Sequence, residues 1–223
     1  LHVGWGCDRK DPTTANPDSP THDRPYYNNL AGKGPNFNDP QEMRYKHVGT
    51  TDCGTSIDLV VTAASEFTPY DANRTGCNGH FGQISMAVGD SVKLNFSLRD
   101  AGTDAPITPK SFHISFFDLD GGRVEQRVSL AADQFDGYEL TNTTYVHVNA
   151  TAESTTFWGP PPCTTDDNGD GKVDDYTFDG HAAKCDNHFV DNPTDPYALN
   201  DDQRDISVNL LFVQRSSFEI TLS

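Results

Sequence analysis

The sequence is poor in positive charge and in long apolar stretches. It has 16 Lys and Arg residues against 33 Asp and Glu residues, which gives a formal net charge of −17. This acidic balance repels nucleic acids and anionic lipids, so neither is an expected partner. No window approaches the roughly eighteen consecutive apolar residues of a membrane-spanning helix, and no long apolar series follows helical spacing. The sequence therefore predicts neither membrane insertion nor a helical bundle.

Short catalytic motifs are also missing. The chain has no GxSxG, no phosphate-binding loop and no dinucleotide fingerprint, and its 8 histidines form no HxH or HExxH spacing. Acidic pairs are too numerous to single out a glycosidase dyad, so a hydrolase that uses Asp or Glu is the least favoured of three function classes. We expect a protein that is not an enzyme.

Turn-forming residues and aromatics are, by contrast, plentiful. The 18 Gly and 14 Pro indicate many loops, while 13 Phe and 8 Tyr are enough to build a packed core. Short β-branched or alternating segments occur at 56–64, 91–98, 111–119, 206–213 and 217–222. About ten short strands separated by turns are typical of an all-β fold, and we expect a jelly-roll-type β-sandwich.

The expected sandwich occupies residues 48–223 and has two additions. Residues 1–47 form a Pro- and Asn-rich N-terminal arm, predicted to be ordered or to cover a sheet edge. Residues 159–200 form an insertion that contains an acidic loop. The arm has aromatic residues that can anchor it, namely Trp5, Tyr26, Tyr27, Phe37 and Tyr45.

Five cysteines occur, and none forms the CxxC spacing of a zinc knuckle or a thioredoxin-like motif. Pairing between sequence neighbours is the simplest hypothesis, and it joins Cys163 to Cys185 and Cys53 to Cys77. Each bond would close a loop of about twenty residues and contribute about 3 kcal/mol in the chain-entropy model. Cys7 is then left unpaired by this scheme, and it is either a free thiol or a partner of a cysteine in another chain or in a part of this chain that the sequence does not include. The sequence alone leaves the connectivity open.

Four glycosylation sequons accompany these cysteines, at Asn73, Asn95, Asn142 and Asn149. Disulfides and N-glycans both belong to an oxidising secretory pathway, so we expect an extracellular or cell-surface protein. The chain begins at Leu1 without a charged and apolar leader, which fits either a removed signal peptide or a piece of a longer chain.

The strongest chemical signal is the acidic loop that follows Cys163. Oxygen-bearing side chains recur there at every second position before a glycine, a spacing that wraps a hard cation such as calcium. The expected ligands are Asp166, Asn168 and Asp170 by their side chains, Lys172 by its carbonyl, and Asp174 or Asp175 by a closing carboxylate. Three prolines before the loop exclude the entering helix of an EF-hand, and the spacing resembles the calcium loops of thrombospondin type 3 repeats. A solvated turn is the alternative.

A second, weaker calcium site is expected at Asp118 and Asp120. Both residues fall on one face at the end of a predicted strand, and a pair of glycines then turns the chain. The alternative is a turn that closes a hairpin. Calcium at either place would have a structural role, because extracellular calcium keeps even a weak site filled.

Three segments carry a resemblance to a known group of proteins. They are YKHVGTTDCGTSIDLVVT (Tyr45–Thr62), NGHFGQISMAVGD (Asn78–Asp90) and FHISFFDLDGGRVE (Phe112–Glu125), and a DNP-x-DP piece follows at Asp191. Over 26–223 the chain resembles a secreted β-sandwich module of algal and protist cell-surface proteins, also found in some exported bacterial proteins. The resemblance implies a building block of matrices or of fibrous appendages such as mastigonemes, and it supplies no catalytic residue.

The sequence therefore favours two functions. The first is a glycosylated, calcium-stabilised subunit of an extracellular fibre, appendage or coat, whose partners are copies of itself or neighbouring modules. The alternative is a carbohydrate-binding module or lectin-like adhesin, whose partners are glycans. Its candidate aromatic platforms are Trp158, Tyr138, Tyr70 and Tyr176.

Overall fold

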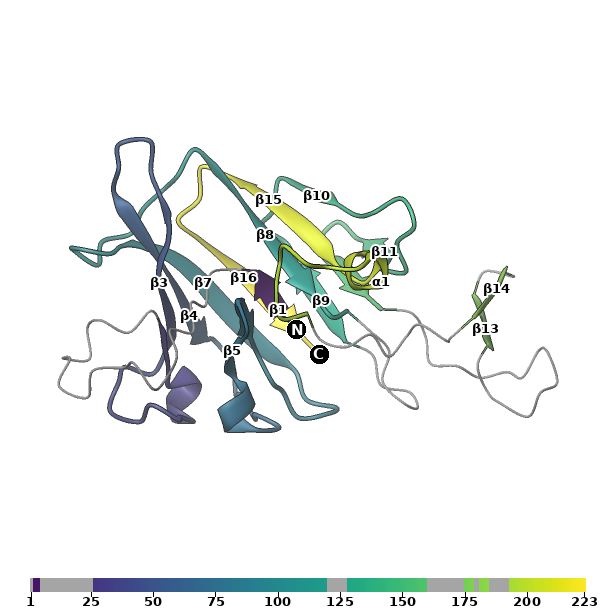
Figure 1. The fold of residues 1–223 in the computed structure, drawn as a ribbon, viewed down its shortest axis with the longest axis horizontal. Coiled ribbons are helices and arrows are strands. Elements are labelled where there is room, and N and C mark those ends of the chain that lie inside the picture. Colours follow the sequence, from purple (N-terminus) through teal and green to yellow (C-terminus); the bar gives the residue numbers. More distant parts are fainter. Residues whose placement is uncertain (1, 5–25, 120–127, 160–174, 179–180, 185–192) are drawn as a thin grey trace.

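The computed structural model describes residues 2–4, 26–119, 128–159, 175–178, 181–184 and 193–223. These residues form two large antiparallel sheets that face each other, and a separate two-stranded hairpin (Figure 1). The predicted all-β, sandwich-like fold is thus confirmed.

One sheet has eight strands, and every pair of neighbours in it is antiparallel. Their order across the sheet is β11 (His147–Ala150), β12 (Thr155–Trp158), β9 (Ser129–Ala132), β16 (Ser217–Leu222), β7 (Val92–Asp100), β4 (Ser56–Ala63), β3 (Met43–Thr50) and β2 (Tyr26–Asn28).

The opposing sheet has six strands, again antiparallel throughout. Their order is β10 (Gly137–Glu139), β15 (Val208–Val213), β8 (Ser111–Phe117), β1 (His2–Gly4), β6 (Phe81–Gln83) and β5 (Gly76–Asn78). The remaining described elements are β13 (Asp175–Phe178), β14 (His181–Lys184), the 3-10 helices η2 (Leu30–Gly32) and η3 (Ala72–Arg74), and α1 (Asp201–Asp205).

The core lies between the two sheets and follows from the alternation seen in the sequence. In β7 the apolar positions, every second residue from Val92 to Leu98, are buried, while the intervening side chains point outward. Phe96 packs edge-on against Phe116 of the other sheet, with ring centroids 6.1 Å apart. Phe212 and Phe218, one from each sheet, stack at 4.1 Å. These aromatic contacts join the sheets into one core.

Three described segments of the N-terminal arm are strands of the two sheets, and a loop at 29–42 connects the last two of them. β1 is flanked by β8 and β6, β2 forms an edge of the eight-stranded sheet, and the expected boundary at residue 47 falls within β3. The register of β3 shifts between Tyr45 and Gly49, where His47 adopts a φ of 57°. Tyr45 and Tyr27 are buried and anchor the arm, as the sequence predicts, whereas Phe37 is exposed.

The single described α-helix, α1, is short and well capped. The Asn200 side chain accepts from the Gln203 N–H, and the Gln203 side chain accepts in return from the Asn200 N–H. Within the described residues, no helix has the length and hydrophobicity needed to cross a membrane.

Candidate functional site

Three loops meet at one end of the sandwich. Ala63 pairs with Leu94 and Met43 pairs with Val61, so the end of β4 lies beside the starts of β7 and β3. The loops 29–41, 64–75 and 84–91 therefore share this end, at the lower left of Figure 1 where η2 and η3 lie. We call these three loops the loop end.

Hydrogen bonds tie the loops to one another. The Ala87 N–H donates to the Thr68 carbonyl at 2.9 Å, which joins the second loop to the third. The Asn28 amide donates to the Thr75 carbonyl at 2.8 Å, and the Thr75 hydroxyl accepts from the Ser85 N–H at 3.2 Å. Asn28 and Thr75 are both buried, so the bond between them is shielded from water, and together the three bonds hold the loops in one arrangement.

Each loop combines a buried apolar anchor with an exposed apolar tip. The anchors are at most 5% exposed, and they are Leu30, Phe67 and Ile84. The tips are 65–71% exposed, and they are Phe37, Tyr70 and Val88. A buried anchor fixes the course of a loop, so the exposed tip is presented with little conformational freedom left to lose on binding.

The first loop shows how tightly its tip is held. The Asn29 side chain accepts from the Gly34 N–H at 3.1 Å and donates to the Asp39 carbonyl at 2.7 Å. Gly34 has a φ of +73°, and a Cβ at this position would lie 2.3 Å from the ring of Phe37. A glycine is therefore required here, because any side chain would strain the backbone and displace the Phe37 ring.

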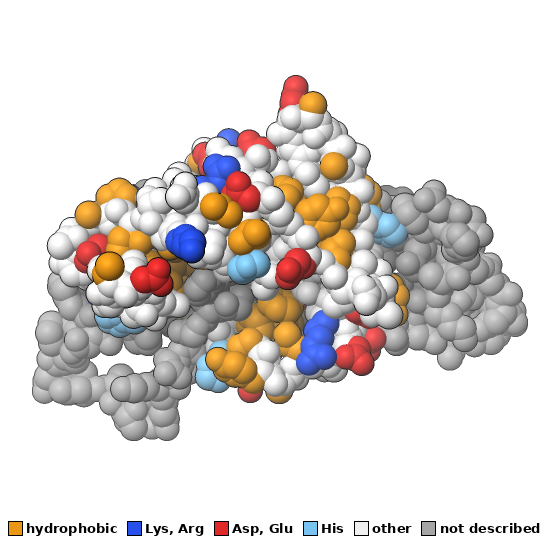
Figure 2. All heavy atoms as spheres, turned by 90° about the horizontal axis from the view of Figure 1, so that it is seen from above, with side chains coloured by type: hydrophobic (Ala, Val, Ile, Leu, Met, Phe, Trp, Pro, Cys, Tyr) orange, Lys and Arg blue, Asp and Glu red, His pale blue; other side chains and the backbone are white. Residues whose placement is uncertain are grey.

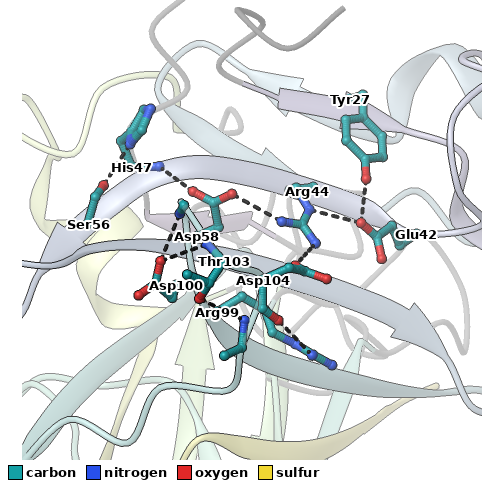
Figure 3. Close-up of polar contacts among 12 residues, drawn as sticks. Tyr27, Glu42, Arg44, His47, Ser56, Asp58, Arg99, Asp100, Thr103 and Asp104 are labelled. Carbon is teal, nitrogen blue, oxygen red and sulfur yellow. Dashed lines mark hydrogen bonds and ion pairs between the residues drawn. The ribbon is translucent and has the colours of Figure 1, made fainter.

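A cluster of charged residues lies on the outer face of the eight-stranded sheet (Figure 3). Arg44 of β3 contacts three carboxylates, with nitrogen–oxygen distances of 2.9 Å to Glu42, 3.2 Å to Asp58 and 2.6 Å to Asp104. Tyr27 donates its hydroxyl to Glu42. Burial would lower the pKa of Arg44, but the hydrogen bonds to Asp104 and Glu42 outweigh it and raise that pKa, so the guanidinium stays charged.

This Arg44 cluster serves to hold the sheet together. Asp58 is 2% exposed and also accepts from the backbone N–H of His47, at the register shift in β3. Burial, together with the hydrogen bond to Glu42, raises the pKa of the Tyr27 phenol above its ordinary value. The charges therefore satisfy one another and pin the irregular strand β3 to β4 and to the turn that contains Asp104.

Figure 2 shows the face of the molecule on the opposite side from the loop end. Among the described residues, acidic and basic side chains are scattered there between apolar ones, and no single kind of charge gathers into a patch. The described part of this face therefore has mixed charge rather than a surface of one sign.

The main predicted calcium site lies outside the described residues, apart from the backbone of Asp175 at the start of β13. Asp118 is 9% exposed at the end of β8, with a φ of 69°, and burial raises its pKa; Asp120 lies outside the described residues. No group of three His, Cys, Asp or Glu side chains able to hold a metal occurs in the described part of the chain. Calcium binding at both places stays a prediction.

One of the predicted disulfides is wrong. Cys53 is an exposed free thiol, whereas Cys77 is disulfide-bonded, so the two are not joined. Cys53 lies in the turn between β3 and β4, at the end of that sheet away from the loop end, while Cys77 lies in β5 of the opposing sheet. Closeness in sequence is a poor guide here because a strand and a loop separate the two residues. Cys7, Cys163 and Cys185 lie outside the described residues.

Three of the four sequon asparagines are exposed, namely Asn73, Asn142 and Asn149. Asn95 is half-buried in β7, where its side-chain oxygen accepts from the Ser97 hydroxyl at 3.2 Å. Glycosylation itself stays a prediction, and Asn73 is the sequon that lies within the loop end.

The aromatic residues expected to form a sugar-binding platform lie in different surroundings. Tyr70 is 71% exposed at the loop end. Tyr138 packs edge-on against Phe157 at 5.1 Å, and Trp158 lies half-buried beside His147. The side chain of Tyr176 is outside the described set. Of the three side chains that the structure describes, Tyr70 is therefore the one whose ring is mostly exposed and accessible to a ligand.

Comparison with known proteins yields distant structural similarities. No protein-family model and no curated protein matches the chain. The chain is similar to the N-terminal domain of the Streptococcus gordonii adhesin Sgo0707, with a TM-score of 0.41 and 8% identity over 81% of this chain and 44% of that one. It is also similar to the adhesin domain of PrgB from Enterococcus faecalis, with a TM-score of 0.40 and 14% identity over 82% of this chain and 56% of that one.

The chain spans about half the length of these two structures. Similarity at this level assigns no function. The resemblance to algal and protist surface modules has no counterpart among these matches.

Proposed function

We propose that this chain is a cell-surface binding module, a lectin-like adhesin, that contacts its ligand through the loop end. The observation that supports this is the set of three exposed apolar tips, Phe37, Tyr70 and Val88, each on a loop with its own buried anchor. Loops held by a rigid sandwich are a common place for binding surfaces, because the scaffold fixes loops that vary in sequence.

The side chains at the loop end favour a neutral glycan as ligand. Aromatic rings such as those of Tyr70 and Phe37 stack on the apolar face of a sugar ring and still leave its hydroxyls in water. The net charge of −17 disfavours sulfated or sialylated glycans over neutral ones, since it repels anions at low ionic strength.

The proposal keeps the extracellular setting expected from the sequence. Exposed sequons at Asn73, Asn142 and Asn149 are accessible to glycosylation in the folded chain.

Calcium in the acidic loop would stabilise the insertion. Asp170→Ala should then abolish the lowering of the melting temperature by chelator, and an unchanged chelator response would refute the site.

A glycan array, followed by calorimetric titration of its best ligand, tests the binding proposal. Tyr70→Ala and Phe37→Ala should each weaken binding about tenfold or more, the loss expected when an aromatic contact of 1.4 kcal/mol or more disappears. Tyr197→Ala is the matched control, because Tyr197 is 95% exposed but lies outside the loop end. Equal affinity for all four proteins would exclude the loop end as the site, and an array without any ligand would exclude the lectin function.

A second candidate function, a subunit of an extracellular fibre or coat, is favoured by a different observation. The short strand β1 lies in the interior of the six-stranded sheet, with a strand on either side. A place of this kind can accept the same strand from another copy of the chain, which would link copies together. Electron microscopy of the native protein, with calcium and after chelation, tests this function directly. Fibres would support it, and monodisperse single particles at all concentrations would oppose it.

A further inference from the structure

The six-stranded sheet is continuous only because β1 fills a gap in it. On one side His2 and Val3 pair with Phe117 and Phe116 of β8. On the other side the three residues of β1 pair with β6, Gly4 lying opposite Phe81. Without β1, the sheet would separate into β10–β15–β8 and β6–β5, with two facing edges of unpaired backbone groups. Such edges readily accept a strand from another chain.

The walls of this gap are held in place by contacts that do not involve β1. β8 pairs with β15 from Val208 to Val213. On the other wall, the Tyr45 hydroxyl donates to the Gly76 carbonyl at 2.6 Å, which ties β5 to the eight-stranded sheet. The His80 N–H donates to the Thr194 carbonyl at 2.9 Å, next to β6. Both walls therefore keep their partners whichever strand lies between them.

The gap also favours a glycine at position 4 of the strand that enters it. The rings of Phe81 and Phe117, on the strands flanking β1, lie 5.2 Å apart and nearly perpendicular. Strands two apart in a sheet are separated by about 9.5 Å, so these rings meet above the backbone of the strand between them. Gly4, at the register position of Phe81, has no side chain to compete for this space. A β-branched residue at position 4 would compete for the space that the rings occupy.

We propose that this gap is an exchangeable strand-binding slot, and that its other occupant is β1 of a second copy of this chain. The link between β1 and β2, residues 5–25, can extend to about 70 Å, which is enough to reach a neighbouring molecule. Exchange of a short strand between two copies preserves every backbone pair while joining the two chains. The inference deepens the fibre candidate and is independent of ligand binding at the loop end.

The experiment uses the full chain together with a synthetic peptide of residues 1–10 that contains Cys7→Ser. Chain and excess peptide are unfolded together in guanidinium without reductant, refolded, and examined by native mass spectrometry and light scattering. We expect one peptide bound per chain and a loss of any oligomers, because the peptide caps the slot. A peptide that also contains Gly4→Val should bind at least about tenfold more weakly.

A full chain with Gly4→Pro provides the second measurement, since proline removes the N–H and disfavours pairing by its own β1. This variant should bind the peptide more tightly than the parent does, because its own strand competes less. Gly49→Val is the control, since Gly49 lies in β3 and a Cβ there meets nothing within 4 Å.

The outcomes test the slot, the exchange of strands and the formation of fibres separately. Absence of peptide binding to both the parent and the Gly4→Pro chain overturns the slot. Oligomers that survive excess peptide overturn strand exchange but leave the fibre candidate standing on other contacts. Peptide-sensitive closed dimers support exchange and remove the fibre, and peptide-sensitive open polymers support both.

Discussion

The two sheets of the sandwich are built in contrasting ways. At the centre of the eight-stranded sheet, β7 pairs with β4 over seven positions and with β16 over six. In the six-stranded sheet the interior strand β1 pairs over three positions with β6 and over two with β8. Long ladders with alternating apolar residues supply stability, whereas a strand of three residues makes few contacts and can leave at low cost. The six-stranded sheet thus combines a long ladder between β15 and β8 with one strand, β1, that is held by few pairs.

The largest effect is expected in the core between the sheets. Phe96 of β7 is 1% exposed and stacks on Phe218 at 5.0 Å. Phe96→Ala should lower the free energy of unfolding by about 3–5 kcal/mol, because it leaves a cavity in the core. Guanidinium denaturation measures this loss, with Phe37→Ala as the exposed control at about 0.5 kcal/mol or less. Similar losses for both variants would contradict the assignment of the core.

The next effect concerns the Arg44 cluster, which braces β3 in the eight-stranded sheet. Asp58→Ala removes a carboxylate that is 2% exposed, which takes one of three carboxylate partners from Arg44 and the acceptor from the His47 N–H, so a loss of about 3 kcal/mol is expected. Asp104→Asn is the matched control, because Asp104 is 64% exposed. This variant should lose only about 0.5 kcal/mol of the free energy of unfolding. Thermal unfolding of both variants measures the difference. The brace would be refuted if Asp104→Asn proved the more damaging change.

A smaller, pH-dependent effect is expected at Asp118, at the end of β8. Burial raises the pKa of this carboxyl above its ordinary value of 3.8, so the folded chain keeps the proton to higher pH than the unfolded chain. The resulting stabilisation is complete below pH 3.8 and disappears as the pH rises through the folded value. In chelator, the stability of Asp118→Asn relative to the parent should therefore be higher at pH 7 than at pH 3. Denaturation at both pH values measures this gain, and an equal difference at both would contradict it.

The smallest effect is expected at the loop end. Tyr70→Ala should change the free energy of unfolding by no more than about 0.5 kcal/mol, since 71% of the residue is in contact with solvent. Phe67→Ala, the anchor of the same loop, should cost about 3 kcal/mol or more. Denaturation curves of the pair separate tip from anchor. A large loss for Tyr70→Ala would show that it belongs to the core and would weaken the binding proposal.

The sequence predicts the long strands better than the short ones. The alternation over 91–98 and 206–213 corresponds closely to β7 and β15, because one face of each strand is buried and the pattern extends over several residues. β1, β5 and β6 have three residues each, which is too few for alternation to be detected. Their place in the sheet depends on pairing with distant segments, and the sequence does not show this pairing.

The candidate site could be predicted only in part. Tyr70 stands out as an aromatic in a loop, but Phe37 lies in a Pro- and Asn-rich stretch that suggests anchoring, and the structure leaves it exposed. Arg44 contacts a carboxylate 60 positions away, so no local motif could reveal this cluster. The failed pairing of Cys53 with Cys77 has the same cause, since the fold places sequence neighbours in opposite sheets.

Native-state hydrogen exchange on the full chain tests the contrast between the two sheets most directly. The account predicts that amides of β1, and those of β6 and β8 that pair with it, exchange through a local opening of lower free energy than global unfolding. Amides of β4, β7 and β16 should exchange only through global unfolding. Equal opening free energies for β1 and β7 would contradict the account, because β1 would then be as firmly held as the core.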